Sequence, residues 1–441
     1  MEKILKKVVK FGGSSLADAG QFKKVKDIIM ADKGRRFVVP SAPGKRFSGD
    51  DKVTDLLLAC QLTSAEGGDW GSIFAKIEER YNSIIKELGL SVSLHEEFAV
   101  IRKAFADGCT KDYAASRGEY LNGILLADYL GYEFIDAATV VFFDKDGNFD
   151  AVKTNRVMGH VLESCENAVI PGFFGRGVDG EVVTFSRGGS DITGAIVARA
   201  VTADIYENWT DVSGFLMADP RIVENPKSIN IITYRELREL AYMGASVLHE
   251  DAIFPVKVAG IPINIKNTNE PEASGTRIVA TTEQYQNEYI ITGIAGKKGF
   301  ALINIEKDMM NSELGFGMKV LSVLAEMGIN FEHLPSGIDT MSVVVAESAI
   351  KGRERQLLSR ISALVSPDNI DIEKGIGLIA VVGRGMIRTQ GTACRVFDSL
   401  AREGINIRMI DQGSSELNII IGVEEHDFDS AIRTVYNEFV N

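Results

Sequence analysis

The chain has 441 residues and a formal net charge of −13, because 48 lysines and arginines face 61 aspartates and glutamates. Its hydrophobic share of 45% and charged share of 25% are those of a folded protein, which excludes disordered and fibrous classes. The acidic balance argues against a broad nucleic-acid surface, and no apolar run reaches the roughly 18 residues that span a membrane.

The four cysteines lie far apart and form no C-x-x-C pair, and the five histidines show no metal-ligand spacing. We therefore expect reduced thiols and no metal site built from protein ligands alone. Residues 1–10 carry scattered lysines instead of the apolar core of a signal peptide, which predicts a cytoplasmic protein. At about 150 residues per domain, the length predicts roughly three domains.

The first 270 residues alternate short apolar runs with helical periodicity. Apolar residues at three- and four-residue steps from Ile73 to Leu88 predict a helix, and Thr233 with Glu236 predicts a capping box that opens another. Strands alternating with helices predict a mainly parallel sheet with helices on both faces and ligands beyond the strand ends. Brief runs rich in β-branched residues are the predicted strands: 8–9, 37–39, 168–170, 205–206 and 261–265.

A Gly-Gly turn follows the first predicted strand. Gly12 and Gly13 precede a helix that we expect to start near Asp18, and adjacent glycines let backbone N–H groups approach an anion closely. Lys10 closes the strand and is a natural phosphate partner. The lysine comes before the glycines, so this is neither a Walker A loop nor a spaced-glycine dinucleotide motif. A plain tight turn is the alternative.

A second glycine pair lies just before the helix predicted at residues 192–200. Arg187 suits a planar carboxylate, and Asp191 is placed to orient a lysine or hold Mg²⁺. The alternative is that Ser190 and Asp191 merely cap the helix. Capping leaves Arg187 and the two glycines unexplained, so the segment favours ligand binding.

The C-terminal third contains an internal repeat with an offset of 76 residues, beyond a polar boundary near residues 271–288. Aligning 315–337 with 391–413 gives eight identities in 23 positions. Each copy reads strand, glycine-containing turn, helix, Gly-Ile-Asn turn, strand and strand, which predicts a duplicated β-α-β-β unit. A duplicated structural spacer is the alternative.

The chain resembles the aspartate kinases of the amino-acid kinase superfamily, and its duplicated unit resembles their paired ACT domains. The resemblance implies an α/β three-layer sandwich with a mainly parallel central sheet over residues 1–283. Two ferredoxin-like (βαββαβ) ACT domains then cover 290–366 and 370–441, with the strand near 290–295 expected to pair with the second. The motifs that carry the resemblance are Lys10-Phe-Gly-Gly-Ser14, Ser41 with Val53-Thr-Asp-Leu56, Arg117-Gly-Glu119, Arg187-Gly-Gly-Ser-Asp191, Thr210-Asp-Val-x-Gly214 and Asp219-Pro-Arg221.

The resemblance implies transfer of phosphate from Mg-ATP to the side-chain carboxylate of L-aspartate, the first step of lysine, threonine and methionine biosynthesis. That carboxylate has an ordinary pKa of about 3.9, so the reaction needs charge neutralisation and alignment instead of a general base. The implied residues are Lys10, Gly12, Gly13 and Asp191 for catalysis; Ser41, Thr54, Glu119, Arg187, Gly188, Gly189 and Ser190 for aspartate; and Lys10, Gly12, Gly13, Thr210, Asp211 and Arg221 for ATP.

Arg187 is expected to hold the α-carboxylate of aspartate and Glu119 its ammonium group; a surface ion pair with Arg117 is the alternative for Glu119. Two other functions stay open. One is a superfamily kinase acting on acetylglutamate, glutamate, carbamate or a nucleoside monophosphate. The other is a silent amino-acid sensor, since Ser246 and Leu216 stand where many relatives carry a nucleotide-binding lysine and tyrosine. The intact Lys10 argues against the sensor.

The first repeat is the expected effector site. Ser312 and nearby helix amides suit an α-carboxylate, and Glu332 or Asp339 suits an ammonium group. The second repeat has Arg408 in place of Glu332, so we expect the first repeat to bind lysine in preference to threonine. Each unit leaves sheet edges and a bare sheet face to be covered, which predicts a homodimer joined through residues 290–441.

Overall fold

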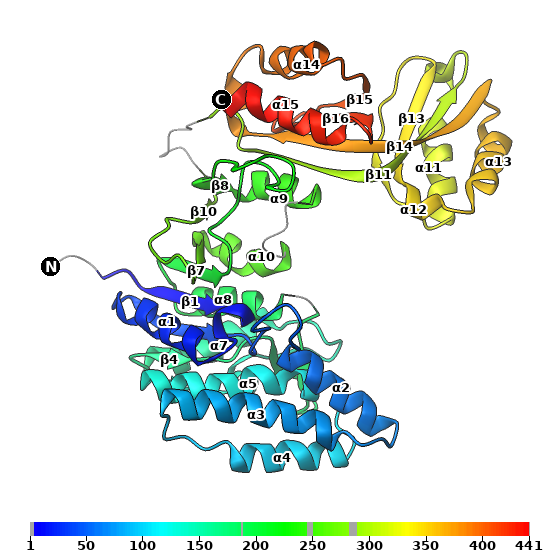
Figure 1. Cartoon of the computed structure of the whole chain (residues 1–441). Helices are drawn as coiled ribbons and strands as arrows, with labels where there is room; N and C mark the ends of the chain where they lie inside the picture. Colours follow the sequence, from blue (N-terminus) through cyan, green and yellow to red (C-terminus); the bar gives the residue numbers. More distant parts are fainter. Residues whose placement is uncertain (1–3, 187, 245–249, 282–288, 441) are drawn as a thin grey trace. The chain divides into compact units, whose positions relative to one another are not determined.

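The computed structural model describes residues 4–186, 188–244, 250–281 and 289–440, and it divides into two compact units (Figure 1). The first unit comprises residues 1–215, 230–234 and 247–282. The second comprises 216–229, 235–246 and 283–441, so the chain enters the second unit twice before the repeats begin. None of the helices in the described ranges is long and apolar enough to cross a membrane.

The first unit is built on an eight-stranded sheet of order β3-β4-β2-β1-β7-β9-β10-β8. All neighbours run parallel except β10 with β9, which confirms the mainly parallel sheet. A separate hairpin pairs β5 with β6. The strands are β1 (Lys7–Phe11), β2 (Arg35–Pro40), β3 (Glu133–Phe134), β4 (Ala168–Val169), β5 (Phe174–Arg176), β6 (Val182–Thr184), β7 (Ile205–Thr210), β8 (Ile231–Thr233), β9 (Ile263–Asn267) and β10 (Thr276–Val279).

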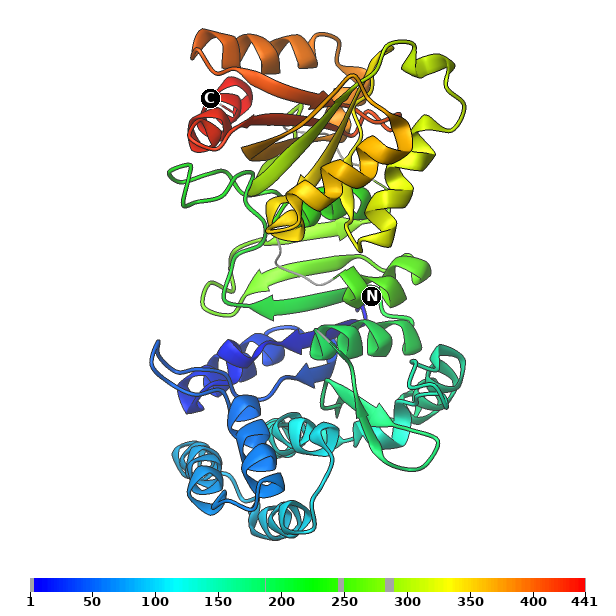
Figure 2. The ribbon, with the colours of Figure 1, turned by 90° about the vertical axis from the view of Figure 1, so that its right-hand side faces the viewer.

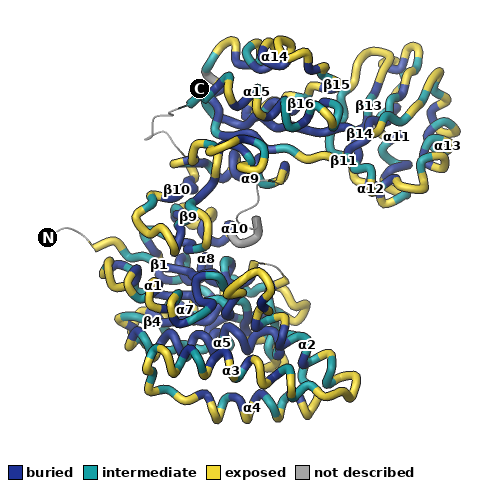
Figure 3. Tube along the Cα trace, in the orientation of Figure 1, coloured by how far each residue is buried: buried dark blue, intermediate teal, exposed yellow. Residues whose placement is uncertain are grey.

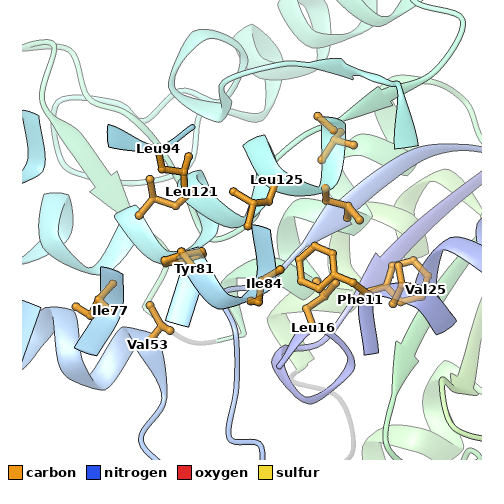
Figure 4. Packing of buried hydrophobic residues seen from close by; sticks show 14 of the residues in the cluster. Phe11, Leu16, Val25, Val53, Ile77, Tyr81, Ile84, Leu94, Leu121 and Leu125 are labelled. Carbon is orange, nitrogen blue, oxygen red and sulfur yellow. The ribbon is translucent and has the colours of Figure 1, made fainter. Parts of the chain in front are cut away.

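Helices cover both faces of this sheet, as the alternating pattern predicted. On one face, Val9 and Phe11 of β1 pack with apolar side chains from α1, α3 and α5 (Figure 4). On the other, α8 contacts β1, β2 and β7. The helices are α1 (Ala19–Met30), α2 (Val53–Ala65), α3 (Gly71–Leu88), α4 (His95–Ala106), α5 (Lys111–Leu130), α6 (Ala137–Val140), α7 (Ala151–Glu163), α8 (Gly189–Ala200) and α10 (Glu250–Ala259), with a short 3₁₀ turn η1 (Gly13–Leu16).

The second unit is built on a six-stranded antiparallel sheet of order β12-β13-β11-β14-β16-β15 (Figure 2). Its strands are β11 (Gly293–Glu306), β12 (Phe331–His333), β13 (Thr340–Ala346), β14 (Asn369–Val382), β15 (Ile407–Asp411) and β16 (Asn418–Glu424). Its helices are α9 (Tyr234–Tyr242), α11 (Phe316–Glu326), α12 (Glu347–Ile350), α13 (Glu354–Val365), α14 (Thr392–Arg402) and α15 (Phe428–Val440), with short 3₁₀ turns η2 (Met310–Ser312) and η3 (Arg384–Arg388). The first residue of α9, Tyr234, belongs to the first unit.

The predicted repeat is confirmed, because α14 lies 76 residues after α11 at both ends. Two strands run through both copies: the end of β11 pairs with the start of β14, whereas Gly293–Lys297 pairs with Leu378–Val382. The second βαββαβ unit therefore takes one strand from ahead of the first. Figure 3 shows the strands of both sheets largely buried and the outer helix faces exposed.

Candidate active site

Lys10 is a buried cation at the end of the central strand β1. Its side chain lies on the sheet face opposite Val9 and Phe11, where α8 packs. The ammonium nitrogen is 2.6 Å from Oδ1 of Asp191 and 3.4 Å from Oδ1 of Asn208, its register partner on β7. Asn208 also donates from Nδ2 to Asp191 at 2.9 Å. The aspartate thus orients the lysine, one of the two roles predicted for it.

Asp191 lies inside the first turn of α8 and does not cap it. The N-cap residue is Gly188, in the left-handed conformation at φ 57°, and no side chain caps this end. The alternative that Ser190 and Asp191 merely cap the helix is therefore wrong. Steric constraints explain why both positions are glycine: Gly188 adopts a positive φ, and a Cβ on Gly189 would lie 2.4 Å from Phe173. Arg187 lies outside the described residues.

The Gly12-Gly13 turn packs against a second loop. Gly12 donates its N–H to the carbonyl of Trp209 at 2.9 Å, and the carbonyl of Gly13 accepts from Gly44 at 2.8 Å. A Cβ on Gly13 would lie 2.8 Å from the carbonyl oxygen of Ala42. The backbone of both glycines therefore contacts the backbone of neighbouring segments. At residue 13 this contact is too close for any residue other than glycine.

The loop after β2 carries Ser41 and closes on itself before Thr54. Ser41 donates its N–H to the carbonyl of Phe11 at 3.0 Å, which fixes it beside the end of β1. At the base of the loop, Val53 donates its N–H to the carbonyl of Pro43 at 3.2 Å. Thr54, on the first turn of α2, is thereby held near the start of the loop despite the long segment between them.

Glu119 is a buried carboxylate on α5, with 6% of the residue exposed. Burial raises its pKa to about 7, although a hydrogen bond from the Ala42 N–H acts in the opposite direction. Its Oε2 has no hydrogen-bond partner among the described residues. A buried carboxylate with a free oxygen is a suitable acceptor for a substrate ammonium group.

Arg117 turns away from Glu119. Its guanidinium donates to the hydroxyl of Ser116 and packs over three aromatic rings, which belong to Tyr113, Tyr120 and Phe174. Both residues are buried, so the alternative of a surface ion pair is wrong.

Comparison with known proteins identifies the fold and the activity. The amino acid kinase family model matches residues 6–267, and an ACT domain model matches 379–439. Aspartokinase 3 of Bacillus subtilis is 40% identical over 98% of both chains. The crystal structure of Clostridium acetobutylicum aspartate kinase is 53% identical, covers 99% of this chain and 100% of its own, and superposes with a TM-score of 0.92.

The chain belongs to the aspartokinase family. Its activity is therefore that of an aspartate kinase, with an allosteric regulatory ACT region. Two structures of Escherichia coli aspartokinase III, each 26% identical, also cover nearly all of both chains. One contains aspartate and ADP (98% and 99% covered, TM-score 0.71), and the other lysine and aspartate (99% and 100%, TM-score 0.73).

Thr210, Asp211 and Arg221 are also expected to bind the nucleotide. Thr210 ends β7, the neighbour of β1, and its hydroxyl donates to Asp211 at 3.1 Å. Arg221 lies in segment 216–229 of the second unit and is exposed. It forms a 2.6 Å ion pair with Asp219 and so lowers the pKa of that carboxyl.

The residues expected to bind an effector fall at two places in the first repeat. Ser312 and Asp339 meet at Met309: the serine hydroxyl donates to its carbonyl at 2.7 Å, and Asp339 accepts from its N–H at 2.9 Å. Glu332 instead accepts from the hydroxyl of Tyr242 on α9. Asp339 directly precedes the start of β13, whereas β12, which carries Glu332, pairs with the end of β13. Roughly 15 Å of strand therefore separates Glu332 from Asp339.

Two residues of the site were missed in the sequence. Asn208 is a buried amide beside the buried Glu207 in the middle of β7, and two polar residues inside a short strand were the available signal. Asn122 is buried one helical turn after Glu119 and donates to the carbonyl of Ser41 at 2.7 Å. Its spacing from Glu119 placed it on the same helix face.

Proposed function

We propose that this kinase transfers the γ-phosphoryl group of Mg-ATP to the side-chain carboxylate of L-aspartate at the site around Lys10. The observation that carries the proposal is the buried Lys10 ammonium, paired with Asp191 beside the Gly12-Gly13 turn. Aspartate and ADP in the E. coli relative support the same substrates here.

The geometry around Lys10 fits a phosphate group. A Cβ on Gly12 would lie 3.6 Å from the lysine nitrogen, so a side chain there would cover the cation that glycine leaves open. No group of three or more histidines, cysteines, aspartates or glutamates in the described ranges is arranged to hold a metal. Asp191 supplies one carboxylate, which suits Mg²⁺ because that ion takes few protein ligands together with substrate phosphates. When bound, Mg²⁺ supplies further neutralisation of phosphate charge.

The acceptor carboxylate is ionised at neutral pH, so no residue has to remove a proton. Lys10 balances negative charge on the migrating group, and Asn208 and Asp191 hold its ammonium in place. Glu119 accepts a hydrogen bond from the ammonium group of aspartate through its free Oε2. Ser41 and Thr54 lie at the base of the loop that follows β2. By its motif, Arg187 holds the α-carboxylate.

The activity is tested by incubating the protein with Mg-ATP and one acceptor at a time, and trapping any acyl phosphate with hydroxylamine. We expect hydroxamate from aspartate, and none from glutamate or acetylglutamate. Product from another acceptor would favour a different superfamily kinase. No product from any acceptor, including carbamate and nucleoside monophosphates followed by ADP release, would favour the sensor.

A second copy of this chain is the proposed partner of the first repeat. Large apolar side chains are exposed there, and Leu314 is 97% exposed between η2 and α11. Exposed apolar side chains of this size favour a protein interface. The exposed residues are Met309, Leu314, Met318, Phe331, Ile338 and Leu364.

We expect Leu314→Glu to convert a dimer to monomers in sedimentation velocity, because a carboxylate would be buried at the interface. Val152→Glu is the matched control, since Val152 is 83% exposed on α7 of the first unit. A Leu314→Glu variant that remains dimeric would contradict the assignment to the first repeat.

Lysine is the proposed inhibitor, supported by the acidic groups of the first repeat and by the lysine in the E. coli relative. We expect lysine to inhibit the aspartate assay and Asp339→Ala to weaken that inhibition, because the ammonium group loses a carboxylate. Glu332→Ala is measured beside it, and threonine is titrated separately. Relief by Glu332→Ala alone would move the site to β12, and inhibition by threonine alone would overturn the choice of lysine.

A further inference from the structure

Arg80 is a buried arginine on α3 that the proposed chemistry does not use. Only 5% of it is exposed, among the apolar residues of the main core. Its guanidinium contacts two segments. In the loop after β2, Nη2 donates to Oδ2 of Asp50 at 2.7 Å and Nη1 donates to the carbonyl of Gly44 at 3.0 Å; after η1, Nη1 also donates to the carbonyl of Ala17 at 3.3 Å. A buried cation with its donors committed to backbone of two loops fixes the distance between them.

The two carbonyls flank the Gly12-Gly13 turn. Ala17 directly follows η1, which starts at Gly13. Gly44 donates its N–H to the carbonyl of Gly13 at 2.8 Å, and a Cβ on Gly44 would lie 2.7 Å from the carbonyl carbon of Gly13. Arg80 therefore holds the turn from one side through Ala17 and from the other through Gly44.

Asp50 balances the buried charge of Arg80. Arg46 donates to Asp50 from Nε and Nη2, both at 2.8 Å, and from its backbone N–H at 3.0 Å. Hydrogen bonds from Arg46 and the charge of Arg80 hold the pKa of Asp50 well below its ordinary value. The long loop is thus closed by Asp50 and attached to α3 by Arg80.

We infer that Arg80, balanced by Asp50, is a positioning residue that aligns the Gly12-Gly13 turn with the loop carrying Ser41 for phosphoryl transfer. The inference rests on the proposed roles of that turn and loop. Arg80 acts through Gly44 and Ala17. Misplacing reacting groups by about 1 Å costs on the order of 100-fold in rate, so loss of this contact reduces turnover while ground-state binding persists.

The test compares Arg80→Lys and Asp50→Asn with Arg102→Ala. Lysine still pairs with Asp50 but cannot serve Gly44 and Ala17 together, because it lacks the planar fork of arginine. Arg102→Ala is the control. Arg102 lies on α4 and donates two hydrogen bonds to Glu78 of α3, at 2.9 and 2.7 Å, so its removal also breaks a paired arginine–carboxylate contact on α3. We expect kcat to fall about 100-fold in Arg80→Lys and at least 10-fold in Asp50→Asn. KM for ATP should change by less than about threefold, and Arg102→Ala should keep full turnover.

A purely structural ion pair predicts the opposite, namely full kcat in Arg80→Lys at temperatures below its melting midpoint. That result would overturn the inference. If Arg80→Lys does not fold, Asp50→Asn decides, because it leaves Arg80 in place and removes the balancing charge together with one acceptor oxygen. Lys10→Ala is assayed in parallel: if it too retains turnover, the proposed site fails, whereas loss in Lys10→Ala with full activity in Arg80→Lys rejects only the positioning role.

Discussion

Lys10→Ala is expected to reduce turnover by at least about 100- to 1000-fold, the loss typical of removing one preorganised stabiliser of transition-state charge. The lysine nitrogen stands 3.6 Å from where a Cβ on Gly12 would be, so it faces the open side of the turn. The variant should remain folded, because Asp191 keeps its 2.9 Å hydrogen bond from Asn208. ATP binding, measured by calorimetry, should persist, since most phosphate contacts remain.

Lys7→Ala is the matched control for this prediction. Lys7 lies on the same strand but on the other sheet face, and it pairs with Asp32 at 2.7 Å and Glu207 at 3.4 Å. We expect its removal to leave turnover unchanged in the hydroxylamine assay. Retention of a tenth or more of wild-type turnover in Lys10→Ala would refute the assigned role.

Glu119→Gln is expected to raise KM for aspartate by about 100-fold, because a buried ammonium group loses its charged partner. The amide retains the shape of the side chain and an oxygen for the Ala42 N–H. The wild-type KM should also rise as pH falls below about 7, because the carboxyl is then protonated and cannot balance the substrate charge. The variant should lack this pH dependence, and an unchanged KM or an unchanged profile would contradict the role.

The same carboxyl affects stability in the ligand-free protein. Its pKa rises from 4.5 to about 7 on folding, so the folded chain binds this proton more tightly than the unfolded chain. The resulting stabilisation is complete below about pH 4.5 and is lost as pH rises through about 7. Between pH 5 and 8, the melting temperature of the wild type should therefore fall relative to Glu119→Gln, a difference that saturating aspartate should remove.

The parts of the site that depend on neighbouring residues could be predicted from the sequence. Lys10, Gly12 and Gly13 lie within four residues, so the local sequence alone predicts a cation at a strand end beside a glycine turn. The repeat was also visible, because residues 315–337 and 391–413 share spacing as well as identities. Glu119 emerged only through its motif, since nothing local shows that α5 buries it.

The remaining contacts depend on which segments meet in three dimensions. Arg80 is read as one charge on an apolar helix face, and only the fold brings Asp50, Gly44 and Ala17 to it. The capping alternative for Asp191 is wrong for the same reason. Capping is a local rule, whereas the partner of Asp191 is a lysine on a strand far away in the sequence.

The continuous strands β11 and β14 bear on how the regulatory region unfolds. Each of the two strands contributes hydrogen bonds to both repeats. Unfolding of one repeat therefore removes the hydrogen-bond partner of a strand in the other. We therefore expect the region to unfold as a single cooperative unit despite its two-copy sequence. A fragment starting at residue 370 would lack Gly293–Lys297 and leave Leu378–Val382 as an open apolar edge, a template for aggregation. The two copies of the repeat therefore depend on each other for a complete sheet.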